Sequence, residues 1–164
     1  MIKHESQRGY FAYSLFNEMK KNKNIYLICI DLGYKVFDAH FEAYPKRTFN
    51  TGAAEQSAMD IAIGLALDGK IPFVYSITPF LLYRPFEALR TYIDHEKIPV
   101  KLIASGRDED YKHDGFSHYA GDDKKFLDQL PNIKAFWPLT KEEIPQLVEY
   151  AVNDSSAYYI NLSR

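Results

Sequence analysis

Apolar residues follow two alternating patterns along the chain. Short continuous runs of branched and aromatic residues, such as residues 25–30, end at a polar residue, as expected for strands that are buried on both faces. Longer stretches place apolar residues three or four positions apart, which is typical of amphipathic helices. The runs predict strands at residues 25–30, 72–76, 100–104, 133–136 and 158–162, and we expect a further short strand at 48–50. The spaced patterns predict helices at about 10–21, 34–43, 53–67, 80–95, 124–130 and 141–152.

This alternation predicts the fold class. A chain that repeats strand and helix builds a parallel or mostly parallel sheet with helices on both faces. We therefore expect an α/β fold with three layers, helix on sheet on helix. A length of 164 residues fits one domain. Within that domain, we expect an N-terminal helix in residues 1–23 and the core in residues 24–164.

Composition and charge narrow the function classes. Hydrophobic residues make up 46% of the chain and charged residues 26%, which suits a globular core. The net charge is -2 with no block of like charge, so we expect neither nucleic acid nor a membrane as partner.

The one cysteine, Cys29, lies inside an apolar run and predicts a buried structural thiol. The absence of a signal-like start predicts a cytoplasmic location. Thirteen Tyr and 11 Phe favour association with another chain.

Four segments directly follow predicted strands, and these are where we expect chemistry. Ligands of parallel sheets bind outside the carboxyl ends of the strands. The segments are residues 51–56, 78–80, 105–123 and 137–138, and all four should lie at one edge of the sheet. In the second of them, Thr78 is the expected N-cap and Pro79 the first helical residue.

Glu55 is the acidic residue of the first segment, Thr51-Gly52-Ala53-Ala54-Glu55-Gln56. We expect it in the first turn of a helix, with its carboxylate directed at the sheet edge. An acidic residue at this position also complements the helix dipole, and spacing alone does not separate the two interpretations. Behind it, small and apolar residues form one helical stripe that we expect to lie mostly in the core: Ala54, Ala58, Ile61, Ala62 and Leu65.

Three aromatic residues follow the second segment at a spacing of three: Phe80, Tyr83 and Phe86. On a helix such residues fall within about 120° of one another. They predict a shelf of rings near the start of that helix, beside the edge that carries Glu55. An aromatic row of this kind is more often part of a core than a ligand platform. Arg84 lies beside it and predicts a polar border.

The third segment is a long polar loop, and long loops in compact domains are usually functional or mobile. It contains four residues of types that can bind metal ions: Asp114, His118, Asp122 and Asp123. Their spacing matches no specific metal site, so we expect a solvated loop and no metal.

Taken in order, four motifs resemble the pyrimidine-binding domain of transketolases, and the matching domain of 1-deoxyxylulose-5-phosphate synthases. The motifs are residues 44–56, 64–75 and 79–87, followed by Asp114-Gly115-Phe116-Ser117-His118. The resemblance covers about residues 26–162. It implies the thiamine diphosphate-binding fold.

The resemblance also implies roles for single residues. Glu55 would hydrogen-bond the aminopyrimidine ring of thiamine diphosphate and promote the imino tautomer that removes the thiazolium C2 proton. A carboxylate in a dry pocket suits this task because it can share a proton with a ring nitrogen. Phe80, Tyr83 and Phe86 would pack on the pyrimidine as further cofactor contacts. Asp114 and His118 would bind the substrate, and His118 would join Glu55 as a catalytic residue.

The same resemblance implies a partner. Members of the family bind the diphosphate and a metal ion through a Gly-Asp-Gly motif on a separate domain, and this sequence contains no such motif. The chain would therefore be the pyrimidine-binding subunit of a split transketolase-like enzyme. A diphosphate-binding subunit would supply the diphosphate and Mg half of the site, in a heterodimer or heterotetramer. Together they would transfer a two-carbon ketol unit from a ketose to an aldehyde, whereas the chain alone would be inactive.

Two alternatives stay open at this point. The chain is a non-catalytic scaffolding or regulatory domain, or it is a subunit of another thiamine diphosphate enzyme, of the 2-oxo acid dehydrogenase or deoxyxylulose phosphate synthase type. Two departures concern the substrate. Gly106 stands where phosphate-reading transketolases usually have a histidine, and Trp137 stands where they have an arginine. Both departures put a sugar phosphate in doubt.

Overall fold

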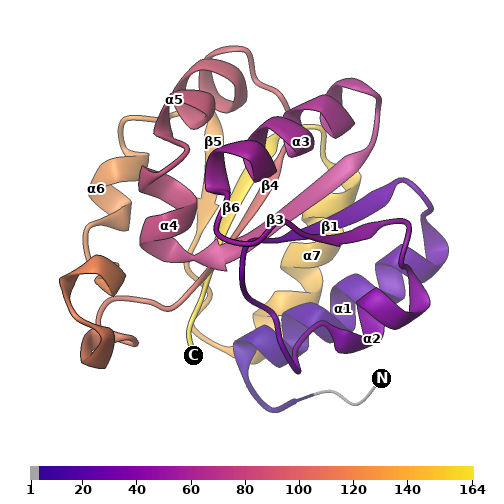
Figure 1. Ribbon diagram of the computed structural model, residues 1–164, viewed down its shortest axis with the longest axis horizontal. Coiled ribbons are helices and arrows are strands. Elements are labelled where there is room, and N and C mark those ends of the chain that lie inside the picture. Colours follow the sequence, from indigo (N-terminus) through magenta and orange to yellow (C-terminus); the bar gives the residue numbers. More distant parts are fainter. Residues whose placement is uncertain (1–3) are drawn as a thin grey trace.

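A parallel sheet forms the centre of the computed structural model, which describes residues 4–164 (Figure 1). In this range six strands pair in the order β2-β1-β3-β4-β6-β5, and every pairing is parallel. The prediction of an α/β fold is confirmed, with a sheet that is entirely parallel. The strands are β1 (Ile25–Cys29), β2 (Thr48–Asn50), β3 (Ile71–Ile77), β4 (Lys101–Ser105), β5 (Ile133–Phe136) and β6 (Ala157–Leu162).

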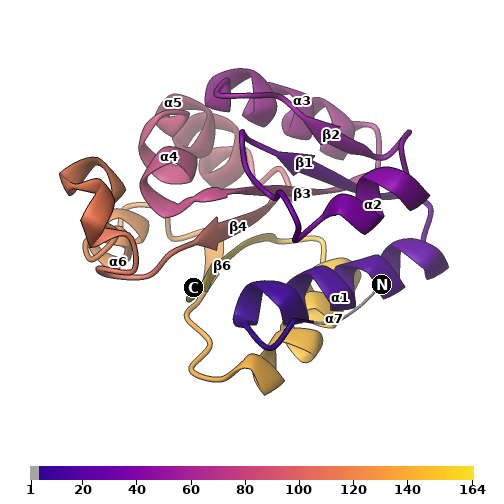
Figure 2. The ribbon, with the colours of Figure 1, turned by 60° about the horizontal axis from the view of Figure 1, so that its bottom comes forward.

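Helices cover both faces of the sheet, which gives the expected three layers (Figure 2). On one face lie α1 (Gln7–Lys21), α2 (Asp38–Ala43) and α7 (Ile144–Asn153); on the other lie α3 (Glu55–Leu67), α4 (Thr78–Tyr83) and α5 (Phe86–Ala88), with α6 (Asp123–Leu127) beside α4. Each face has its own apolar cluster. Leu15 and Val148 pack with Phe73 in one cluster, and Ala58 packs with Val74 in the other. The alternating strand residues thus bury side chains on both sides of the sheet.

The predicted continuous helix at residues 80–95 is wrong. The structure divides it into α4, α5 and a π-helical segment, η1 (Leu89–His95). Pro85 explains the first break, because proline lacks the N–H that would continue the helix. Thr78 is also not the N-cap: that position belongs to Ile77, and Thr78 begins the helix. The Thr78 hydroxyl instead donates to the carbonyl of Gly106 (2.6 Å).

Other boundaries shift for local reasons. The helix predicted from residue 34 begins at Asp38, since Gly33 and Lys35 both have positive φ (100° and 63°) and form a turn. The helix predicted at 141–152 opens with a 3-10 turn, η4 (Lys141–Glu143), before α7. On α3, Ala58 and Ala62 are buried as expected, but Ile61 faces outward and is exposed.

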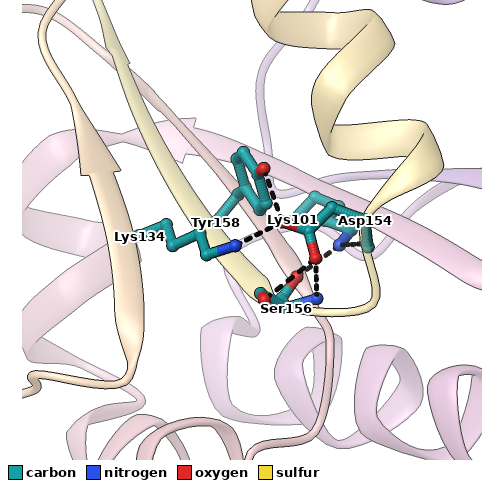
Figure 3. Close-up of polar contacts among 5 residues, drawn as sticks. All are labelled: Lys101, Lys134, Asp154, Ser156 and Tyr158. Atoms are coloured by element: carbon teal, nitrogen blue, oxygen red, sulfur yellow. Dashed lines mark hydrogen bonds and ion pairs between the residues drawn. The ribbon is translucent and has the colours of Figure 1, made fainter.

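Polar contacts at the amino ends of the strands fasten α7 to the sheet (Figure 3). The carboxylate of Asp154, just after α7, accepts hydrogen bonds from Lys134, Ser156 and the Tyr158 hydroxyl (2.8 Å). The Lys101 ammonium donates to the main-chain carbonyls of Asp154 (2.7 Å) and Ser156. The Lys134 hydrogen bond holds the pKa of Asp154 well below its usual range, and burial lowers the pKa of Lys101 to about 8. This cluster lies at the amino ends of the strands, opposite to the carboxyl edge at which we expect the functional site.

Two further expectations concern Cys29 and membranes. The Cys29 thiol is buried, and burial raises its pKa to about 12, as expected for an inert structural thiol. Between residues 4 and 164, none of the helices has the length and apolar character needed to cross a bilayer.

Candidate functional site

The four predicted segments lie at the carboxyl edge of the sheet, because all strands are parallel. Contacts connect three of them: Thr78 donates to the carbonyl of Gly106, and Arg107 Nη1 donates to the carbonyl of Pro138 (3.0 Å). The strand order reverses between β1 and β3, since the chain passes outward from β1 to β2 and returns on the other side of β1. Such a switch point is the usual ligand site of an open parallel sheet.

Glu55 lies in the first turn of α3, as the sequence predicts, although the helix begins at Glu55 itself and not at residue 53. The loop from β2 turns at Gly52, whose φ of +64° favours glycine and whose N–H donates to Asn50 Oδ1 (2.9 Å). This turn brings Glu55 to the sheet edge, where its side chain is only 7% exposed. A buried carboxylate requires a partner. Here the partner is Arg84, whose Nη1 forms an ion pair with Glu55 Oε1.

The Arg84 guanidinium also lies over the ring of Phe80, 3.9 Å from its centroid. Carboxylate, guanidinium and ring are therefore in contact in that order. The Arg84 side chain remains 48% exposed. Sequence reasoning placed Arg84 only at the border of the aromatic row. The available signal was its position four residues after Phe80, where side chains on a helix meet.

The three aromatic residues of the predicted shelf separate into two groups. The Phe80 ring packs edge-on against His118, with centroids 4.9 Å apart. The rings of Tyr83 and Phe86 each pack against Phe126 of α6, with centroids 5.1 Å apart. The interruption at residues 84–85 explains the division, since Phe86 belongs to a new helical segment. Phe80 is thus the shelf residue that shares a partner with Glu55.

The motif at residues 114–118 forms two short turns, η2 (Lys112–Asp114) and η3 (Phe116–His118). Gly115 joins them with a φ of +84°. His118 reaches the Phe80 ring, and its Nδ1 lies 3.0 Å from the hydroxyl of Ser117. Asp114 is exposed, and its carboxylate pairs with His113 Nε2 at 3.2 Å. The structure therefore brings His118 to the candidate site and leaves Asp114 at its outer border.

A buried network centred on Asp123 was missed by sequence reasoning. Asp123 Oδ2 accepts hydrogen bonds from Trp137 Nε1 (2.8 Å), the Tyr159 hydroxyl (2.8 Å) and Asn161 Nδ2 (2.6 Å). Burial, and then the Asp123 charge, raises the pKa of Tyr159 well above its usual value, so the phenol stays a donor. The network ties the end of the polar loop to β6. The sequence pattern suggested Asp123 only as a possible metal ligand.

Aromatic groups fill both positions at which the sequence departs from the family pattern. Gly106 has a φ of +87°, and a Cβ there would lie 2.3 Å from the Tyr111 ring. The Tyr111 hydroxyl lies 3.3 Å from both Arg8 Nη1 and Ser105 Oγ. At the other position, the Trp137 indole is held by Asp123. A cation lies beside each aromatic group: the Arg164 guanidinium is 5.1 Å from the centroid of the Tyr111 ring, and the Lys124 ammonium is 5.4 Å from the centroid of the Trp137 ring.

A cavity of about 580 Å³ opens at the carboxyl ends of β1, β2 and β3. Its walls include Arg8, Asp31, Asn50, Tyr75 and Tyr111. The volume lies in the range of small-molecule sites. Burial raises the pKa of Tyr75 to about 12, against a smaller opposing effect of Ser105, so this phenol stays protonated. Within residues 4–164, His, Cys, Asp and Glu side chains form no group of three or more suited to a metal ion.

Comparison with known proteins gives consistent matches. A family model described as "Transketolase, pyrimidine binding domain" matches residues 6–164. The "Putative transketolase C-terminal section" of Methanocaldococcus jannaschii is 31% identical over 152 residues, 90% of this chain and 48% of the relative. An apulose-4-phosphate transketolase subunit of Actinobacillus succinogenes is 33% identical over 119 residues, 73% of this chain and 38% of the relative.

Comparison with solved structures also gives a match to a transketolase. One described as "Split gene transketolase, inactive beta4 tetramer" superposes with a TM-score of 0.84 at 31% identity, covering 97% of this chain and 52% of that one. The chain therefore spans about half the length, or less, of these relatives.

Proposed function

Because the chain belongs to the transketolase pyrimidine-binding domain family, we propose that it is the pyrimidine-binding subunit of a split transketolase-like enzyme. The enzyme depends on thiamine diphosphate and transfers a two-carbon ketol unit from a ketose to an aldehyde. A partner chain supplies the diphosphate and magnesium half of the site. Catalysis requires both chains.

The observation that carries the proposal is the environment of Glu55. Its carboxylate is almost fully buried at the ligand-binding edge of the sheet, next to an aromatic ring, with one guanidinium lying between them. A guanidinium is planar, delocalised and rich in N–H donors. An aminopyrimidine has the same general shape and also presents N–H groups. The residues present therefore fit the pyrimidine half of the cofactor.

Four residues of this chain have defined tasks in the proposed site. The bound cofactor supplies the nucleophilic carbon and the electron sink for the two-carbon fragment. Glu55 holds or shares a proton at the ring nitrogen, in a dry setting that strengthens the hydrogen bond. Phe80 provides a flat apolar wall. Tyr83 and Phe86 extend this wall toward α6, fixed by their contacts with Phe126.

The substrate side of the site comprises His118, Asp114 and the cavity beside Arg8. His118 lies against Phe80, so it is placed to hydrogen-bond a reacting hydroxyl close to the cofactor wall. Asp114 lies on the same loop as His118, is exposed, and suits a sugar hydroxyl farther out. The cavity is large enough for a monosaccharide. Tyr111 and Trp137 lie where the family histidine and arginine are missing, and Arg164 and Lys124 lie against their rings, so the test below includes both phosphorylated and plain ketoses.

The names of the relatives support a division between two chains. One relative is described as a transketolase subunit, another as a C-terminal section, and a solved one as the product of a split gene. The solved relative is described as an inactive tetramer of beta chains. These descriptions agree with a chain that needs a different partner for activity.

The test is reconstitution. The chain is mixed with a candidate diphosphate-binding chain encoded by a neighbouring gene, and ketol transfer is measured with thiamine diphosphate, Mg²⁺, and phosphorylated or plain ketoses. We expect transfer by the mixture only, and loss of transfer with Glu55→Ala. Glu42→Ala, which alters an exposed glutamate on α2, is the matched control and should keep full activity. A mixture that transfers no ketol unit and binds no cofactor contradicts the proposal and favours a scaffold.

A further inference from the structure

We propose that Arg84 is a place-holder for the pyrimidine ring of the cofactor, and that it must leave Glu55 and Phe80 when the ring enters. This inference rests on the proposed function and adds to it a residue that sets cofactor affinity. Arg84 is not a catalytic residue in this account. It competes with the cofactor for the two groups that the cofactor needs.

The first argument is that Arg84 already makes both contacts. Its Nη1 is paired with Glu55 Oε1, and its guanidinium covers one face of Phe80 at 3.9 Å from the ring centroid. A separation of this size is van der Waals contact, so no second planar group fits between the guanidinium and that face. A ring that stacks there and also hydrogen-bonds Glu55 must displace Arg84.

The second argument is that Arg84 is free to move. Half of its side chain is exposed, whereas Glu55 is 7% exposed. Arg84 directly follows α4, and Pro85 interrupts the helix there, so no continuous helix packs the arginine in place. Water solvates the guanidinium once it swings outward.

The third argument concerns the energy of Glu55. A buried carboxylate without a partner is costly, and Arg84 removes this cost as long as no cofactor is bound. The same contact then opposes cofactor binding, because the ion pair must break first. Removing the guanidinium raises the free energy of the empty site and leaves the loaded site unchanged. Cofactor affinity should therefore increase.

The experiment titrates thiamine diphosphate with Mg²⁺ calorimetrically into the complex of this chain with its diphosphate-binding partner. Arg84→Met keeps much of the side-chain bulk and removes the charge. We expect it to bind about fivefold more tightly than the wild-type complex, the effect of a modest ion pair. Arg90→Met removes an exposed arginine of η1 and should leave affinity unchanged. Arg84→Gln tests the same point if Arg84→Met does not fold.

Unchanged or weaker binding by both Arg84 variants, with normal wild-type binding, overturns the place-holder and leaves the proposed function intact. Weaker binding in particular means that Arg84 helps to hold the cofactor. A wild-type complex that binds no cofactor overturns the proposed function, and the place-holder fails with it. The two failures are therefore distinguishable in one set of titrations.

Discussion

Glu55 and Arg84 lie 29 residues apart in the sequence, and their ion pair joins the first residue of α3 to the residue that follows α4. The pair is asymmetric, because the carboxylate is buried and the guanidinium is half exposed. Solvent screening weakens such a pair, whereas removal of the guanidinium leaves a buried carboxylate without its ion-pair partner.

A double-mutant cycle on the isolated chain measures this coupling. We expect Arg84→Met to lower the free energy of unfolding by about 1 kcal/mol, and to have little effect in a Glu55→Gln background. Urea unfolding at neutral pH provides the values. Equal losses in both backgrounds mean that Arg84 stabilises the fold through its stacking on Phe80 alone.

His40 makes stability depend on pH. The ring is fully buried between Phe16 and Phe37, and burial lowers its pKa from 6.5 to about 4, partly offset by the carbonyl of Ala12. The unfolded chain therefore takes up a proton below pH 6.5 that the folded chain resists. Stability should fall by about 3 kcal/mol as the pH drops from 6.5 to 4.

The matched variant for that test is His40→Leu, which removes the titrating ring and keeps an apolar side chain. Urea unfolding at several pH values gives the slope for each protein. The variant should lose the decline that the wild type shows in this window. Parallel slopes would assign the decline to other groups.

The backbone conformation of Gly106 and the adjacent Tyr111 ring both disfavour a side chain at position 106. Gly106→Ala places a Cβ against the Tyr111 ring, at a positive φ that disfavours side chains. We expect a loss of about 2 kcal/mol or more in unfolding free energy. Gly64→Ala is the control, because Gly64 lies within α3 and a Cβ there meets no described atom within 4 Å. That variant should gain about 0.5–1 kcal/mol, and similar values for both variants would contradict the account.

The Asp123 network predicts a spectroscopic change. Trp137 is the single tryptophan of the chain, and its indole donates to Asp123. Asp123→Ala leaves three donors without their acceptor, so we expect a loss of about 3 kcal/mol in stability and a shift in tryptophan emission. Asp122→Ala is the neighbouring control, which removes the acceptor of the Tyr83 hydroxyl and should leave the emission unchanged. An unchanged emission in Asp123→Ala would show that the network does not fix the indole.

The sequence predicted the parts of this structure that depend on local pattern. Continuous apolar runs located β1, β3, β4 and β6, since these strands are buried on both faces and have no polar alternation. The position of Glu55 followed from the boundary between β2 and α3. Pro85 is a break signal within residues 80–95, and the regular aromatic spacing on either side of it conceals the break.

Contacts between distant segments were beyond sequence reasoning. The three donors to Asp123 lie 14, 36 and 38 residues away from it, and no local periodicity links them. Tyr111 fills the space beside Gly106 because of the path of a loop, which spacing does not specify. The Glu55 and Arg84 pair depends on how α3 and α4 dock on the sheet. These contacts are tertiary, and they decide how the site is organised.

The most direct test of the central claim is calorimetric titration of thiamine diphosphate and Mg²⁺ into this chain alone and into its equimolar mixture with the candidate diphosphate-binding chain. The account predicts binding by the mixture only, and loss of that binding with Glu55→Ala but not with Glu42→Ala. Equal binding by the Glu55→Ala mixture, or no binding by the wild-type mixture, would contradict a cofactor site shared between two chains.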